Sequence, residues 1–186
     1  LLLGDRLSQE VARCQREAGS FALLFIDLDR FKDVNDTLGH TSGDVVLREA
    51  ARRISHCVRE SDTVSRLGGD DFNVILTQIQ HPQDAGRVSG DIVKSLSEPF
   101  IIDGQSSFLS ASIGIALFPQ DGTSAEALIK NADTAMYRAK SGGRAQAVYF
   151  EEDMNAIAVS RVSLDRELRR AIDRGVELGD VGRVVL

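Results

Sequence analysis

The sequence reads Arg66-Leu67-Gly68-Gly69-Asp70-Asp71-Phe72 between two short apolar segments, Thr63-Val64-Ser65 and Asn73-Val74-Ile75-Leu76. A tight turn between strands needs positive φ angles, which glycine adopts without a clash at Cβ, so the Gly-Gly pair predicts a β-hairpin. Adjacent carboxylates at the tip of a hairpin repel each other and have no packing role. Such a pair is usually kept for a cation or a proton.

A second acidic strand end lies upstream, in Phe21-Ala22-Leu23-Leu24-Phe25-Ile26-Asp27-Leu28-Asp29. The continuous apolar run predicts a strand that is covered on both faces. Asp27 and Asp29 would by themselves suit a solvated strand terminus. Placed beside the hairpin, however, Asp27, the Leu28 carbonyl and Asp70 could supply the oxygen ligands of Mg²⁺, which is common equipment for nucleotidyl transfer.

The pattern of apolar residues predicts an α+β fold. Its core is a ferredoxin-like βαββαβ arrangement, in which helices cover an antiparallel-rich sheet. The strands are expected at 21–27, at both arms of the hairpin, at 100–102, 106–118 and 147–150. The helices are expected at 1–18, 30–35, 44–59, 82–97, 125–140 and 151–174.

Composition narrows the class of protein. The chain has 186 residues and a net charge of −6, which argues against a general nucleic-acid binder because such proteins present a basic face. No segment approaches the ~20 apolar residues of a membrane span, so we expect a cytoplasmic domain without membrane contact. Cys14 and Cys57 lack metal-ligand spacing and are expected to be reduced and structural.

Several polar residues allow two interpretations. Asn35 and Asp44 flank a predicted loop, Gly39–Gly43, and either could simply cap a helix. A carboxylate that accepts from an N–H and a neighbouring NH₂ would instead recognise the edge of guanine. Lys32 is either a surface lysine or, beside a metal site, a phosphate contact.

Two further pairs are equally ambiguous. Lys140 and Arg144 surround Ser141-Gly142-Gly143, where they could cap a helix or close over a triphosphate. Arg59 and Asp62 have the i,i+3 spacing of an ordinary surface salt bridge.

Taken together, these residues resemble the GGDEF family, the diguanylate cyclases, over residues 1–150. Five motifs in the right order carry the resemblance: Phe25-Ile26-Asp27-Leu28-Asp29-Arg30-Phe31-Lys32; Asn35-Asp36 with Gly39-His40 and Gly43-Asp44; Arg66 to Phe72; Ser112-Ile113-Gly114-Ile115-Ala116; and Asn131-Ala132-Asp133-Thr134-Ala135-Met136-Tyr137-Arg138-Ala139-Lys140. The resemblance implies a fold of the nucleotidyl cyclase and polymerase-palm kind. It also implies that two GTP molecules condense to cyclic di-GMP and two pyrophosphates, at a transient face-to-face homodimer.

The resemblance also implies residue roles. Mg²⁺ or Mn²⁺ would bind Asp27, the Leu28 carbonyl and Asp70, while Asp71 would help to activate the ribose 3′-hydroxyl. Seven residues would bind the substrate: Lys32, Asn35, Asp44, Gly68, Gly69, Lys140 and Arg144. Asn35 and Asp44 would recognise guanine, and the lysines and the arginine would bind phosphates. The two glycines would let the backbone lie close to the nucleotide. Arg59 and Asp62 match the Arg-x-x-Asp of the family's product-inhibition site, which would bind cyclic di-GMP.

Two departures from the family pattern bear on activity. Asp71 stands where the family usually has Glu, and the chain begins after the position of the family's Asp-x-Leu-Thr-Gly-Leu-x-Asn-Arg segment. Residues 151–175 resemble the connector into an EAL phosphodiesterase domain, and 176–186 remain unassigned. A GGDEF domain that binds GTP or cyclic di-GMP and regulates an attached EAL domain is therefore the alternative function; a cyclase of another nucleotide specificity is a third interpretation.

Overall fold

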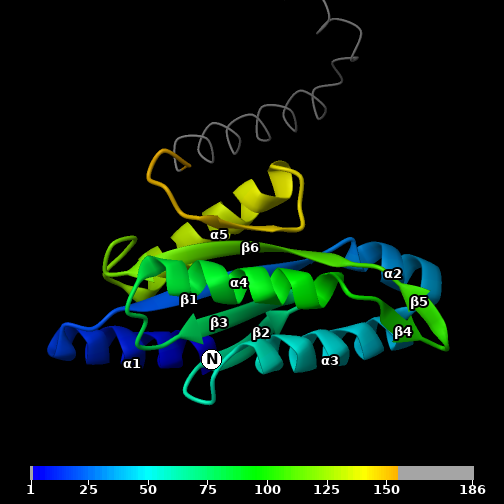
Figure 1. The fold of residues 1–186 in the computed structure, drawn as a ribbon, viewed down its shortest axis with the longest axis horizontal. Helices are drawn as coiled ribbons and strands as arrows, with labels where there is room; N and C mark the ends of the chain where they lie inside the picture. The colour runs from blue at the N-terminus through cyan, green and yellow to red at the C-terminus, as the bar shows by residue number, and fades with distance from the viewer. Residues whose placement is uncertain (1, 155–186) are drawn as a thin grey trace, which may run out of the picture. The chain divides into compact units, whose positions relative to one another are not determined.

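A computed structural model describes residues 2–154, and the described residues up to Glu151 form one compact unit (Figure 1). Within the described residues, no helix is long and apolar enough to cross a membrane. The predicted connector at 151–175 and the tail at 176–186 lie outside the described residues from 155 onward.

A five-stranded sheet with the order β2-β3-β1-β6-β7 forms the centre of this unit. The central strand β1 (Phe21–Asp29) is buried along its whole length and pairs antiparallel with β3 (Asp71–Leu76) and β6 (Ser110–Phe118). At the edges, β2 (Thr63–Gly68) pairs antiparallel with β3, and β7 (Gln146–Tyr149) lies parallel to β6. Four of these strands, in the order β2-β3-β1-β6, have the ferredoxin-like arrangement, so the predicted fold class is confirmed.

Helices cover both faces of the sheet (Figure 1). On one face, α1 (Leu2–Glu17) and α5 (Ala125–Ser141) bury their apolar stripes in one core cluster. On the other, α2 (Phe31–Leu38), α3 (His40–Cys57) and α4 (Pro82–Ser97) contribute to a second cluster. The two-sided cover explains why β1 reads as a continuous apolar run rather than an alternating one.

The prediction of one long strand at 106–118 is wrong, because this segment contributes to two sheets. It is divided into β5 (Gln105–Ser107) and β6, and β5 pairs with β4 (Phe100–Ile102) in a separate two-stranded sheet. The chain leaves one sheet for the other at Phe108, whose side chain is exposed, before Leu109 enters the core. A run of strand-forming residues does not reveal which sheet each part joins.

The predicted loop at Gly39–Gly43 is also wrong, because α3 begins at His40. Gly39 has a φ of 81° and separates α2 from α3. Gly43 is buried in the first turn of α3, where an added Cβ would collide with Asn35 Oδ1 and lie 3.2 Å from Phe31 Cζ. Asp44 therefore lies inside α3 rather than at its N-cap, and the capping interpretation of Asp44 is excluded.

Candidate functional site

Three carboxylates meet where β1 and the β2–β3 hairpin end. Asp27 in β1 is the register partner of Asp71 in β3, and Asp70 precedes Asp71 at the hairpin tip. The turn depends on Gly68 and Gly69, whose φ angles are 155° and 54°. Each of the three acids offers a carboxylate oxygen, and these oxygens lie within 4.8 Å of one another. The structure thus brings together the two acidic strand ends that the sequence predicts to meet.

Burial sets the electrostatics of this acidic cluster. Asp27 is only 8% exposed, and burial raises its pKa to about 6, although Lys140 opposes the shift and Asp70 and Asp71 add to it. Burial also raises the pKa of Asp71, with a further contribution from the charge of Asp70. Carboxylates held this close are stabilised in their charged form by a cation.

The donor set fits a hard divalent cation. Carboxylate oxygens are the ligands that Mg²⁺ and Mn²⁺ favour, and three of them converge here. Leu28 follows Asp27 in β1 and could offer only its backbone carbonyl, because its buried side chain has no ligand atom.

Lys140, in the last turn of α5, contacts the acidic cluster directly. Its Nζ lies 2.5 Å from Asp27 Oδ2. The element α5 packs against β6 and β1, which explains how a residue 113 positions later in the chain reaches Asp27. Lys140 therefore places a compact positive charge beside the acidic cluster.

Asp29 holds the turn that follows α5, a role that the sequence does not reveal. Its carboxylate accepts hydrogen bonds from Ser110 Oγ at 2.7 Å, from Ser112 Oγ at 2.8 Å and from the Ala145 backbone N–H at 3.2 Å. The Arg144 Nε lies 3.8 Å from Asp29 Oδ1, and the rest of the Arg144 side chain is largely exposed. Asp29 is therefore a positioning residue for the turn that carries Arg144.

Asp133 is a second residue that sequence reasoning missed. It lies on α5 two helical turns before Lys140, and its pKa is raised by partial desolvation and by the charge of Asp71. The i,i+7 spacing of Asp133 and Lys140 places both residues on one face of α5. This spacing is the sequence signal that could have identified Asp133 as a neighbour of the site.

A cavity of about 350 Å³ lies between α3 and the hairpin. Its lining consists of Asp44, Leu47, Arg48, Ala51, Arg66 and Phe72. Asn35 does not line this cavity; its amide packs against Gly43 instead. Lys32 is exposed in the first turn of α2.

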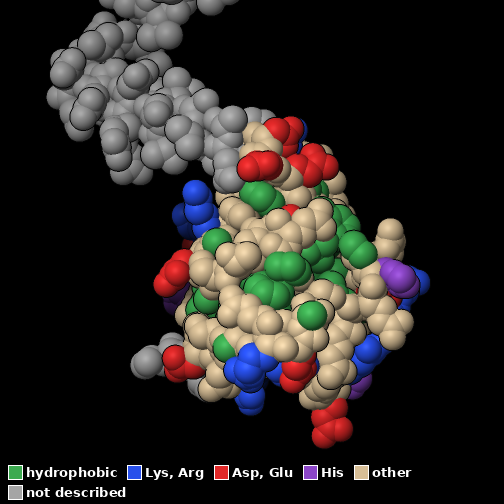
Figure 2. Space-filling view, turned by 90° about the vertical axis from the view of Figure 1, so that its left-hand side faces the viewer, with side chains coloured by type: hydrophobic (Ala, Val, Ile, Leu, Met, Phe, Trp, Pro, Cys, Tyr) green, Lys and Arg blue, Asp and Glu red, His purple; other side chains and the backbone are tan. Residues whose placement is uncertain are grey.

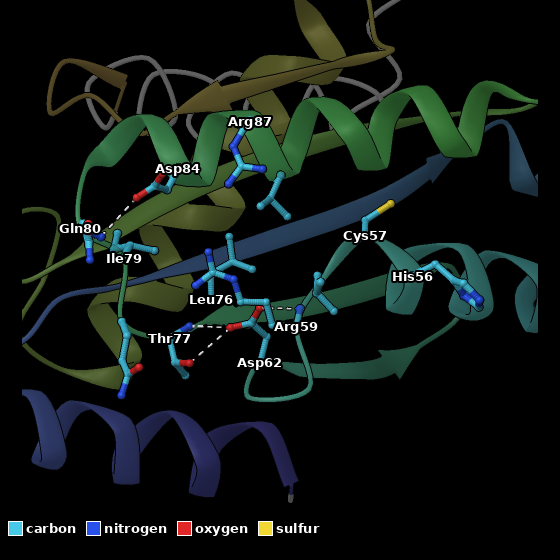
Figure 3. A pocket seen from close by; sticks show the side chains of 13 residues that line it. His56, Cys57, Arg59, Asp62, Leu76, Thr77, Ile79, Gln80, Asp84 and Arg87 are labelled. Atoms are coloured by element: carbon cyan, nitrogen blue, oxygen red, sulfur yellow. Dashed lines mark hydrogen bonds between the residues drawn. The ribbon is translucent and has the colours of Figure 1, made fainter.

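A separate cavity of about 370 Å³ contains Arg59 and Asp62 (Figure 3). The salt bridge that the i,i+3 spacing of Arg59 and Asp62 suggested is not among the ion pairs of residues 2–154. Asp62 instead accepts hydrogen bonds from the backbone N–H groups of Arg59 and Thr77, both at 2.9 Å. Arg87 projects from α4 toward the loop that carries Arg59, so two guanidinium groups converge on this cavity (Figure 3).

The surface at one end of the molecule carries mixed charge. In Figure 2, Lys and Arg side chains are interspersed with Asp and Glu around a central group of hydrophobic side chains. The face in view thus differs from the basic surface that is typical of nucleic-acid-binding proteins.

Sequence comparison identifies relatives of the chain. The family model described as "Diguanylate cyclase, GGDEF domain" matches residues 1–146. The bifunctional diguanylate cyclase/cyclic di-GMP phosphodiesterase MucR of Pseudomonas aeruginosa is 47% identical over 174 residues, which is 94% of this chain and 25% of MucR. The diguanylate cyclase TpbB of the same organism is 44% identical over 140 residues, 75% of this chain and 32% of TpbB. The chain thus spans only a quarter to a third of the length of these curated relatives.

Solved structures agree with this result. The crystal structure of the GGDEF domain of TpbB matches with a TM-score of 0.79 and 42% identity, covering 81% of this chain and 94% of that domain. The GGDEF domain of DgcB from Caulobacter crescentus, solved in complex with c-di-GMP, matches with a TM-score of 0.72 and 25% identity, covering 78% of this chain and 86% of that chain.

Proposed function

Because the chain belongs to the diguanylate cyclase GGDEF domain family, we propose that it condenses two GTP molecules into cyclic di-GMP and two pyrophosphates. The observation that carries the proposal is the convergence of Asp27, Asp70 and Asp71 at adjoining strand ends, with Lys140 against Asp27. Phosphoryl transfer depends mainly on positioning and charge neutralisation, and this site offers both.

In the proposed reaction, the 3′-hydroxyl of each GTP attacks the α-phosphorus of the other, so that two O–P bonds form and two bonds to pyrophosphate break. Asp71 lies at the hairpin tip, where its carboxylate can accept the hydroxyl proton; the raised pKa suits this task. Asp27, Asp70 and the Leu28 carbonyl would hold Mg²⁺ or Mn²⁺, which supplies charge neutralisation at the phosphates when bound.

The remaining residues would bind the substrate. We assign Lys32, Lys140 and Arg144 to the phosphates and Asn35 and Asp44 to guanine. Gly68 and Gly69 have open space where a Cβ would stand, which suits a backbone that a nucleotide approaches closely. Asp44 lines a cavity of about 350 Å³, within the range of about 300–1,000 Å³ usual for small-ligand sites.

The second cavity is our candidate for a product site. Arg59 would bind cyclic di-GMP together with Arg87, because arginine forms paired hydrogen bonds with phosphate and with guanine. Asp62 would shape the loop through its bonds to backbone N–H groups rather than contact the ligand.

The site implies partners beyond the nucleotide. Each domain would bind one GTP, so the reaction requires two copies face to face in a transient dimer. MucR combines cyclase and phosphodiesterase activities, which supports an attached EAL domain in the whole protein. We place the reaction in the cytoplasm, where GTP is available.

Incubation of the chain with GTP and Mg²⁺, followed by chromatography, tests the proposal. Cyclic di-GMP should form, and Asp70→Asn should abolish it while the fold, measured by circular dichroism, stays intact. Near-normal turnover by the folded Asp70→Asn variant would refute the metal assignment. Absence of product with the unaltered chain would refute the cyclase.

A regulatory domain is the second candidate function. Asp71 in place of Glu favours it, as do relatives such as the cyclic di-GMP phosphodiesterase NbdA of Pseudomonas aeruginosa, which is 35% identical over 164 residues. Saturable GTP or cyclic di-GMP binding without turnover would select this function.

A further inference from the structure

Two guanidinium groups line the cavity that contains Asp44, and they differ in how they are engaged. Arg66 donates from Nε to the Gly69 carbonyl at 2.9 Å, so it is committed to the hairpin turn. The Arg48 side chain makes no hydrogen bond or ion pair with any residue between 2 and 154. Arg48 therefore offers its whole guanidinium group to a ligand, whereas Nε of Arg66 is already engaged.

Asp44 and Arg48 are one helical turn apart on α3, where side chains at i and i+4 are neighbours. An acid and an arginine at this spacing commonly pair with each other, yet these two do not, and both line the cavity instead. The next arginine along, Arg52, behaves differently: it is bound to Glu49 at 2.8 Å through both Nε and Nη2 and does not line the cavity.

The part of the cavity lining near Asp44 and Arg48 is apolar. Leu47 and Phe72 are 7% and 1% exposed, and Ala51 completes this part of the lining. Such an apolar surface accommodates a flat, weakly polar ring while the charged groups at its margin contact the polar edges of that ring.

Guanine matches this distribution of charge. Its N1–H and amino groups are donors, which a carboxylate accepts, and its O6 and N7 on the adjacent edge are acceptors, which arginine contacts with two parallel N–H groups. Adenine presents an amino donor beside N7, so that edge is less favourable for arginine.

We propose that Arg48 is a specificity-determining residue, which donates hydrogen bonds to O6 and N7 of the guanine whose adjacent N1–H and amino edge binds Asp44. The inference rests on the proposed function, since it assigns the base of GTP to this cavity. It adds to that function a residue, Arg48, that recognises the O6 and N7 edge of the base.

The test compares binding of GTP and 7-deaza-GTP, which lacks the N7 acceptor, by calorimetric titration of the whole chain with Mg²⁺. The unaltered chain should bind 7-deaza-GTP roughly 5- to 10-fold more weakly, which is part of the discrimination of a bidentate arginine contact. Arg48→Ala should weaken GTP binding and bind both nucleotides equally. Arg52→Ala, the matched control on the same helix, should discriminate as the unaltered chain does.

Arg48→Lys separates base recognition from general attraction to phosphate. It keeps the charge but loses the paired donors, so it should also lose most of the discrimination. Equal discrimination in Arg48→Ala and the unaltered chain would overturn the proposal, and so would the lack of discrimination in the unaltered chain. If GTP itself does not bind, the proposed function fails and the inference fails with it; if GTP binds without discrimination, only the inference fails.

Discussion

Replacement of Asp71 by Glu should increase turnover. Asp71 lies opposite Asp27 in the β1–β3 ladder, and its side chain is one methylene shorter than the Glu that the family usually has there. The backbone of the ladder holds Asp71 in place, so the carboxylate cannot advance toward the substrate. The Asp71 side chain is only partly exposed, and burial raises its pKa.

The size of the effect follows from this geometry. One further carbon–carbon bond, about 1.5 Å long, would move the carboxylate outward by an ångström or more. Misplacement on this scale costs on the order of 10²-fold in rate. That factor corresponds to about 2.7 kcal/mol of activation free energy, at about 1.36 kcal/mol for each tenfold change. We therefore expect Asp71→Glu to raise kcat by up to about 10²-fold with KM for GTP nearly unchanged, because a residue that acts only in the transition state affects kcat alone.

Steady-state release of pyrophosphate gives kcat and KM, and chromatography confirms the nucleotide product. The double variant Asp70→Asn/Asp71→Glu serves as the control and should be inactive. An unchanged or lower kcat in Asp71→Glu would refute the argument from side-chain length. If the unaltered chain also turns over rapidly, Asp71 is tolerated at this position and the regulatory function loses its main support.

Further predictions concern binding and stability. Asp44→Ala should weaken GTP binding by roughly 10- to 100-fold and leave ATP binding little changed, since a hydrogen bond to a charged group contributes about 1.5–3 kcal/mol; equal losses in titrations of both nucleotides would contradict it. Arg59→Ala should remove cyclic di-GMP binding but spare GTP binding, and unchanged product binding would exclude this residue from the product site. Gly114→Ala should lower the free energy of unfolding by about 3 kcal/mol or more, because a Cβ there would collide with the backbone of α5 and lie 2.9 Å from Ala135 C; a denaturant titration with near-normal stability would refute this packing. The pKa of Glu49 is held at about 2 rather than 4.5 by hydrogen bonds to arginines 52 and 53, so its contribution to stability should be lost as the pH falls from 4.5 through 2; the melting temperature of Glu49→Gln should lack that loss, and parallel curves for the two proteins would contradict it.

Local features of the sequence predicted the sheet and the acidic cluster well. The Gly-Gly turn is a local requirement on φ, and the continuous apolar run of β1 is a local consequence of burial on both faces. The sequence analysis expected the two acidic strand ends to lie side by side, and the β1–β3 register pairs Asp27 with Asp71. The family motifs also yielded candidate roles for residues that no local pattern explains, and those roles remain predictions.

Local sequence patterns did not predict where α3 begins or which sheet each part of residues 106–118 joins. Asp44 suited a helix N-cap in the sequence, but α3 begins at His40 and packs Gly43, in its first turn, closely against Asn35. The predicted strand at 106–118 carried no signal that it would be divided between two sheets. In both cases packing against another element decided the outcome, because local propensity is weaker than tertiary contact.

By itself, then, the sequence determined the fold class and the hairpin, and it led us to expect the hairpin acids beside Asp27. Only the tertiary structure decided that Lys140 contacts Asp27, that Asp29 holds the turn bearing Arg144 and that Arg87 lies across a cavity from Arg59. The physical reason is that hydrophobic periodicity and turn chemistry act over a few residues. A contact between side chains far apart in the chain depends instead on how whole helices pack on the sheet.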